Sequence, residues 1–308
     1  MVATQLSFAE HLVTIAVDEP VTLPKQAERV YIPPIKCQGI KSKLVPFLLS
    51  SIKWDGAGRW VEPFIGSGVV LFNVAPARAY VSDTNEHIIR LYRDIAAGVL
   101  TPPIVKTFLK DEGARLQSDG AEHFYAVRER FNARPSSLDF LFLNRSCFNG
   151  VMRFNSKGKF NVPFCRKPDR FAQAYVTKIT NQVGNIARLM HGRDWTFAVA
   201  DWRDTLDGVR ADDFIYADPP YYGRHTEYFT AWGENDAHEL LTRLRNLPAG
   251  FALSTWKQNK YRSNPHLEGD MEGLTIKTKT HFYHVGATEE LRNEMEEALV
   301  IRDGFVAD

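Results

Sequence analysis

Short apolar runs that end on a glycine turn or an acid, each followed by a helical pattern, constrain the fold of this 308-residue chain most strongly. The run RWVEPF (59–64) predicts a strand that leads into the turn IGSG (65–68), and ARAYVSD (77–83) predicts a second strand. The next segment, NEHIIRLYRDIAAG (85–98), has apolar residues at helical spacing and ends on glycine. Strands that alternate with helices of this length predict an α/β fold with a parallel sheet covered on both faces.

The same alternation returns later in the chain. We expect strands at 195–201, 213–218 and 250–255 and a helix at 235–247. Between the two α/β parts the pattern is mostly helical, and RFNSKGKFNV (153–162) is typical of a projecting β-hairpin. The predicted layout is a sheet domain built from 31–99 and 191–308, an inserted domain at 100–190 and an N-terminal extension at 1–30.

Composition excludes several classes of protein. With 44% hydrophobic and 24% charged residues the chain has an ordinary globular composition, and no stretch approaches the roughly 20 apolar residues of a membrane span. The first 20 residues lack the basic start of a secretory signal. Cys37, Cys147 and Cys165 form no CxxC pair, so we expect no disulfide framework, no metal site and a reducing cytoplasm.

Positive charge is concentrated in one segment. Residues 143–170 carry seven basic residues and one acid, a local net charge of +6 in a chain whose total is +1. Phenylalanines are interleaved with these charges: Phe142, Phe148, Phe154 and Phe160. This combination favours nucleic-acid binding over a merely solvated charged surface.

The turn after the first predicted strand has the features of a cofactor loop. Gly66 and Gly68 let the backbone approach a ligand closely, but Phe64 stands where a dinucleotide loop has its first glycine. Such a turn suits a ligand without phosphates better than a pyrophosphate. Asp83, at the end of the second strand, is placed to accept from ribose hydroxyls. Asp201 is either a turn residue or an acceptor for the adenine amino group of the same ligand.

The sequence DFIYADPPYYG (213–223) ends a buried-looking strand on an acid and two prolines, which exclude both helix and central strand. An exocyclic amino nitrogen of a base is a poor nucleophile because its lone pair is delocalised into the ring. The Asp218 carboxylate and the Pro219 carbonyl could accept its two hydrogens and localise that lone pair. Tyr221 could stack on the base, which contributes about 1–3 kcal/mol. The alternative is that these residues form only a turn.

The aromatic segment GRHTEYFTAW (223–232) follows directly. It is either a segment that orders over a bound base or an ordinary surface loop.

Four segments together resemble the Dam-type DNA adenine-N6 methyltransferases, the alpha group or D12 class. They are PPIKCQGIKSKLVPFL (33–48), VEPFIGSGVVLFN with YVSDTNEHIIRLY, FLNRSCFNGVMRFNSKGKFNVPF and DFIYADPPYY. The resemblance extends over about residues 31–300. It implies a Rossmann-like S-adenosylmethionine-dependent methyltransferase sheet with an inserted, mostly helical target-recognition domain. The implied activity is site-specific methylation of N6 of a flipped adenine in double-stranded DNA, in the cytoplasm of a bacterial or phage-infected cell.

The resemblance also assigns residues by position. Those implied to contact S-adenosylmethionine are Lys41, Phe64, Gly66 and Asp83, and the glycine turn and the strand-end acid add Gly68 and Asp201 to the predicted cofactor site. Those implied to hold the adenine are Asp218, Pro219, Pro220 and Tyr221. Those implied to lie on or near DNA are Arg145, Asn149, Arg153, Asn155, Lys157, Lys159 and Arg166, and Lys36 is predicted to join them. The chain departs from the family pattern at Cys37, where Trp is common, and at Ile40, where Gly is common.

Other functions fit the same residues. An N4-cytosine DNA methyltransferase or an RNA N6-adenine methyltransferase would use the same proline turn, and a non-catalytic DNA-binding protein could retain the fold. A cognate restriction endonuclease is a possible partner that the sequence neither requires nor excludes, and it leaves the recognition sequence and the oligomeric state open.

Overall fold

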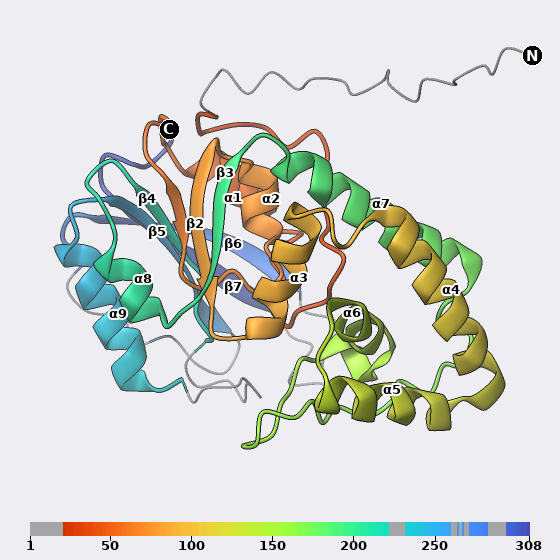
Figure 1. Cartoon of the computed structure of the whole chain (residues 1–308). Coiled ribbons are helices and arrows are strands. Elements are labelled where there is room, and N and C mark those ends of the chain that lie inside the picture. Colours follow the sequence, from red (N-terminus) through yellow and green to blue (C-terminus); the bar gives the residue numbers. More distant parts are fainter. Residues whose placement is uncertain (1–20, 222–231, 260–263, 265–266, 268–270, 283–293) are drawn as a thin grey trace, which may run out of the picture.

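The computed structural model describes residues 21–221, 232–259, 264, 267, 271–282 and 294–308, and the described strands form one twisted sheet (Figure 1). The strands are β1 Trp60–Glu62, β2 Arg78–Asp83, β3 Asp194–Val199, β4 Phe214–Ala217, β5 Gly250–Asn259, β6 Leu274–Phe282 and β7 Glu294–Arg302. Their order is β3-β2-β1-β4-β5-β7-β6. The first five are parallel, and β7 is antiparallel to both of its neighbours. The predicted α/β class with a parallel sheet is therefore confirmed.

Helices cover the sheet on both faces. They are α1 Val45–Ser51, α2 Val69–Val74, α3 Glu86–Ala96, α4 Pro102–Asp119, α5 Ala121–Ala133, α6 Ser137–Ser146, α7 Gln173–Met190, α8 Trp202–Asp207 and α9 Glu234–Asn246. In Figure 1, α8 and α9 lie on one face and α1, α2 and α3 on the other, while α4 to α7 extend away from the sheet beyond α3. Within the described part of the chain, no helix has the length and apolar character of a membrane span.

The two faces of the sheet have separate hydrophobic cores because successive strand residues point to opposite sides. Trp60 and Phe214 stack on one side with ring centroids 5.3 Å apart, and Val61 and Ile215 face α8 and α9 on the other. The first core continues without interruption into the helical region, where it includes Phe140. The helices of 100–190 therefore pack on the sheet domain, and the boundaries predicted for an inserted domain stay a prediction.

The strands and helices expected from the sequence are present, with small shifts at their ends. The predicted hairpin at 153–162 is a tight turn closed by one antiparallel bridge, Phe154 to Phe160, with Asn155 N donating to Lys159 O at 2.9 Å. It has no strand longer than this bridge. Residues 21–30 belong to the packed domain, since buried Leu23 pairs with Trp54, while residues 1–20 lie outside the described residues.

Candidate active site

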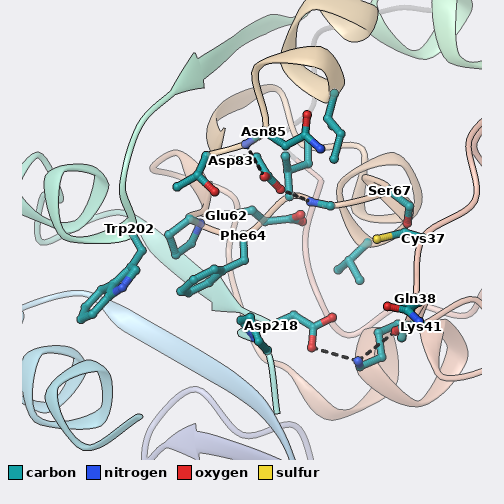
Figure 2. Close-up of a pocket in the computed structure, with 18 of the residues that line it drawn as sticks. Cys37, Gln38, Lys41, Glu62, Phe64, Ser67, Asp83, Asn85, Trp202 and Asp218 are labelled. Carbon is teal, nitrogen blue, oxygen red and sulfur yellow. Dashed lines mark hydrogen bonds and ion pairs between the residues drawn. The ribbon is translucent and has the colours of Figure 1, made fainter. Parts of the chain in front are cut away.

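A cavity of about 170 Å³ opens at the carboxyl ends of β1, β2 and β4 (Figure 2). Its walls come from residues 37–41, 62–67, 83–85 and 201–203, together with Asp218 and Pro220. Ligands of open parallel sheets bind at this position, where the strand order reverses between β1 and β4. In Figure 2, Asp83 and Asp218 lie at opposite ends of the cavity with Phe64 between them.

The turn after β1 holds the carboxylate that ends β2. Gly66 has φ +48°, which favours glycine, and its N–H donates to Asp83 Oδ2 at 3.0 Å. Asn85 N donates to Asp83 Oδ1 at 2.8 Å. Burial raises the pKa of Asp83, and these two hydrogen bonds act against that rise. Each oxygen keeps acceptor capacity, so the fixed carboxylate can receive a pair of hydroxyl groups.

Gly68 has a conformational role in the turn before α2. It begins α2 with φ +72°, and a Cβ atom there would lie 2.6 Å from Cε2 of buried Phe72. Gly68 is absent from the residues that line the cavity, where Ser67 lies instead. Contact between Gly68 and a cofactor stays a prediction, and the structure shows a conformational role for this glycine.

Aromatic side chains line the wall between the two acids. The ring of Phe64 lies 6.3 Å from Trp202 and 5.5 Å from Trp232, measured between centroids. Asp201 caps α8, where its Oδ1 accepts from Arg203 N at 2.9 Å, and it also lines the cavity. The structure thus shows Asp201 as a turn residue, while contact with an adenine amino group stays a prediction. Trp202 was not predicted, although it directly follows the strand-end acid.

Asp218 directly follows β4 at the other side of the cavity. Its Oδ1 forms an ion pair with Lys41 Nζ at 2.9 Å, and Lys41 Nζ also donates to Gly39 O at 3.0 Å. The Asp218 side chain is 21% exposed and that of Lys41 only 4%. Burial raises the pKa of Asp218, as does Glu297, while Lys41 lowers it.

Tyr221 lies beside the cavity and does not line it. Its hydroxyl donates to Glu297 Oε2 at 2.5 Å, and the Lys41 ammonium lies 4.7 Å from its ring centroid. Pro220 lines the cavity, whereas Pro219 is buried and does not line it, so contact of its carbonyl with a base stays a prediction. Stacking of Tyr221 on a base therefore stays a prediction, and the segment expected to order over that base, 223–232, lies outside the described residues apart from Trp232.

Glu62 is a buried acid of the cavity that the sequence did not single out. Burial raises its pKa to about 8, against the hydrogen bond from Trp60 Nε1 to Glu62 Oε1 at 2.7 Å. At neutral pH the group is therefore mostly protonated. Its position as the last residue of a buried strand, directly before Pro63 and Phe64, was the available signal.

Most residues predicted to lie on DNA are accessible. The exposed members are Asn149, Asn155, Lys157, Lys159 and Arg166. Lys36 and Arg153 are half-buried, and burial together with Arg170 and Arg145 lowers the pKa of Lys36 to about 8. The carboxamide of Asn155 also accepts from the main chain of Lys157 and Lys159, at 2.9 and 3.0 Å, which shapes the turn.

Arg145 is a correction to the predicted DNA surface. It is 4% exposed, donates from Nη1 to Pro34 O at 3.1 Å and places its guanidinium 4.8 Å from the ring centroid of Tyr175. A side chain held in this way stabilises the packing of α6 and cannot reach a phosphate. Among the interleaved phenylalanines only Phe148 is well exposed, at 55%, and Phe142 is fully buried.

The comparisons with known proteins agree with this arrangement. A family model described as D12 class N6 adenine-specific DNA methyltransferase matches residues 38–290. The type II methyltransferase M.MjaIII of Methanocaldococcus jannaschii is 29% identical over 65% of this chain and 71% of its own length. The DNA adenine methylase of Serratia marcescens is 33% identical over 57% of this chain, and that of Escherichia coli K12 is 32% identical over 57%. The chain spans about three fifths of the length of these two methylases, 62% and 60%. The chain belongs to the D12 class of N6 adenine-specific DNA methyltransferases.

Proposed function

We propose that this protein transfers a methyl group from S-adenosylmethionine to N6 of an adenine that has left the stack of double-stranded DNA. The observation that carries the proposal is one cavity that joins Asp218, at the end of β4, to the Gly66–Asp83 pair. Membership of the family supports the reaction class. The cavity supports the assignment of its two ends to the base and to the cofactor.

The residues at the Asp83 end fit S-adenosylmethionine, a cofactor with ribose hydroxyls and no phosphates. Asp83 is held by Gly66 and Asn85 as a fixed acceptor, and Phe64 offers an apolar ring beside it. Arg203, which lines the same wall, is engaged by Asp236 and Glu239 at 2.8 and 2.6 Å. Its charge is compensated, so the wall suits a phosphate-free ligand. The bound cofactor would supply an electrophilic methyl group on its sulfonium.

The Asp218 end supplies what the target nitrogen requires. An ionised carboxylate only accepts hydrogen bonds. Asp218 can therefore accept a hydrogen bond from one N–H of the amino group, and the Pro219 carbonyl can accept one from the other N–H. Two acceptors localise the lone pair on nitrogen. Asp218 also stabilises the positive charge that develops on nitrogen as it is methylated. Both reactants lie in one cavity, and this positioning supplies the rest of the rate enhancement.

The DNA partner would lie on the exposed members of the basic segment. Lys157 and Lys159 are exposed on the turn at 153–162, and Arg166 is exposed just beyond it. Met152, from the same segment, lines the cavity. We therefore propose residues 100–190 as the target-recognition region, acting on a base that has left the duplex at a cost of a few kcal/mol. A DNA substrate places the enzyme in the cytoplasm of a bacterial or phage-infected cell, and a restriction endonuclease of the same specificity is a candidate partner.

Product analysis tests the proposal. The purified protein is incubated with labelled S-adenosylmethionine and defined duplex DNA or RNA, and the nucleosides are resolved by mass spectrometry. The proposal predicts N6-methyladenine in duplex DNA. N4-methylcytosine or methylated RNA would assign the chain to the alternative enzymes, and tight DNA binding without any product would make it a non-catalytic binding protein. Methylation-sensitive sequencing of DNA from expressing cells then identifies the recognition sequence.

A further inference from the structure

We propose that Lys41 is a positioning residue for catalysis, whose ammonium orients the Asp218 carboxylate and keeps it in the ionised form that accepts from the target amino group. The resemblance to the family placed Lys41 on the cofactor, whereas its Nζ lies on Asp218 Oδ1 at 2.9 Å. This inference rests on the proposed function, because it assigns a role within that reaction.

Three contacts fix the ammonium in place. Besides the ion pair with Asp218, Lys41 Nζ donates to Gly39 O at 3.0 Å and lies 4.7 Å from the ring centroid of Tyr221. The side chain of Lys41 is 4% exposed, so water replaces none of these contacts. Removing one partner of a buried ion pair leaves an uncompensated charge, which is strongly unfavourable.

The surroundings of Asp218 make this compensation necessary. The titratable groups that face it come from five parts of the fold: Cys37 and Lys41 from the segment before α1, Glu62 from β1, Tyr216 from β4, Tyr221 after it and Glu297 from β7. Glu62 and Glu297 are acids that are each 2% exposed. Lys41 supplies the positive charge among these groups, and without it burial and Glu297 would favour a protonated Asp218.

Protonation of Asp218 would stop the reaction. A carboxylic acid carries a hydrogen on one oxygen, which can no longer accept from the amino group of the base. Lys41 engages Oδ1 and leaves Oδ2 for that amino group. The charge of Lys41 therefore sets the lowest pH at which the enzyme works, while the chemistry of the cofactor side stays unaffected.

The test is the pH dependence of kcat, measured from pH 5.5 to 9.5 at saturating S-adenosylmethionine and duplex DNA. Lys41→Met and Lys41→Gln remove the charge, and Lys41→Arg keeps it. Each uncharged variant is made and measured separately. If thermal melting shows that one of them is misfolded, the other still tests the proposal. Lys43→Met removes an exposed lysine of the same segment and is the matched control.

The proposal predicts that the acid limb of kcat moves up by about 1–3 pH units in Lys41→Met and Lys41→Gln. On the acid side of both limbs their kcat should fall about tenfold for each pH unit by which the limb moves and should recover at alkaline pH, while the limb of Lys41→Arg and Lys43→Met stays in place. The Kd for S-adenosylmethionine should stay within threefold. An unmoved acid limb, or a loss of cofactor affinity as large as the loss of activity, would overturn the proposal. Absence of N6-methyladenine from the wild-type reaction at every pH would instead reject the proposed function.

Discussion

The main-chain N–H of Gly66 donates to the Asp83 carboxylate at 3.0 Å and so joins the turn after β1 to the end of β2. Because Asn85 N donates to the other oxygen, the carboxylate is oriented before a ligand arrives. Such preorganisation lowers the entropy cost of binding. The proposed cofactor end of the cavity is therefore built largely from main-chain geometry, and the single side chain that matters most there is Asp83.

Replacement of Asp83 should weaken cofactor binding selectively. Asp83→Ala removes the acceptor for two ribose hydroxyls, and hydrogen bonds to a charged group contribute about 1.5–3 kcal/mol. We expect the Kd for S-adenosylmethionine, measured by calorimetry, to rise about 10- to 100-fold, with DNA affinity retained. Asp111→Ala, an exposed acid of α4, is the control. An unchanged Kd in Asp83→Ala would move the cofactor away from this end of the cavity.

Gly68 should be required for stability. Gly68→Ala combines a left-handed φ of +72° with a Cβ 2.6 Å from Phe72, whose ring packs 5.1 Å from Tyr92 and has no room to move. We expect a loss of about 2–4 kcal/mol in the free energy of unfolding, measured by urea denaturation. The matched control is Gly98→Ala, at φ +69° with open space around it, where about 1 kcal/mol is expected. Equal losses at the two positions would contradict the steric argument.

Glu62 should make stability depend on pH. Its pKa rises from 4.5 to about 8 on folding, so between these values the folded state binds more protons than the unfolded one. Stability from this group is therefore complete below about pH 4.5 and is lost as the pH rises through 8. Glu62→Gln keeps the acceptor for Trp60 and cannot ionise.

The free energy of unfolding can be measured by urea denaturation at each pH. Between pH 5 and pH 8.5, the stability of Glu62→Gln relative to wild type should rise by about 1–3 kcal/mol. Glu86→Gln, at an exposed position of α3, should show no such change. A difference between Glu62→Gln and wild type that is constant with pH would show that Glu62 titrates normally.

DNA affinity should depend steeply on salt. If about four to six basic residues meet phosphates, the slope of log affinity against log salt lies near −4 to −5, and a slope near zero would exclude phosphate contacts. Lys157→Ala, Lys159→Ala and Arg166→Ala should each reduce the slope by about 1. Arg145→Met is the buried counterpart of these variants, and it should change the melting temperature and leave the slope as it is.

The parallel half of the sheet was predictable from the sequence because its strands end on conspicuous residues. Gly66, Asp83 and Asp218 each follow a short apolar run, and the carboxyl ends of parallel strands meet at one edge. The antiparallel strands β6 and β7 were not predicted. In β7 the acids Glu296 and Glu297 interrupt the apolar pattern, although Glu297 is buried against Tyr221.

Side-chain partners account for what the sequence could not give. A count of charges in 143–170 does not distinguish a buried arginine from an exposed one. Arg145 packs on Tyr175, whereas Arg166 is exposed. The resemblance likewise could not show that Lys41 forms an ion pair with Asp218, since they lie 177 positions apart in the chain and only the fold brings them together. Burial and pairing across strands are properties of the packed structure.

Asp218→Ala provides the most direct test of the central claim. The variant loses the acceptor for the target amino group but keeps the Asp83 end and the exposed basic residues. In a single-turnover assay with labelled S-adenosylmethionine and duplex DNA, we expect transfer to N6 of adenine to be abolished while cofactor and DNA affinities stay within several fold of wild type. Turnover equal to that of the wild-type protein would contradict the account.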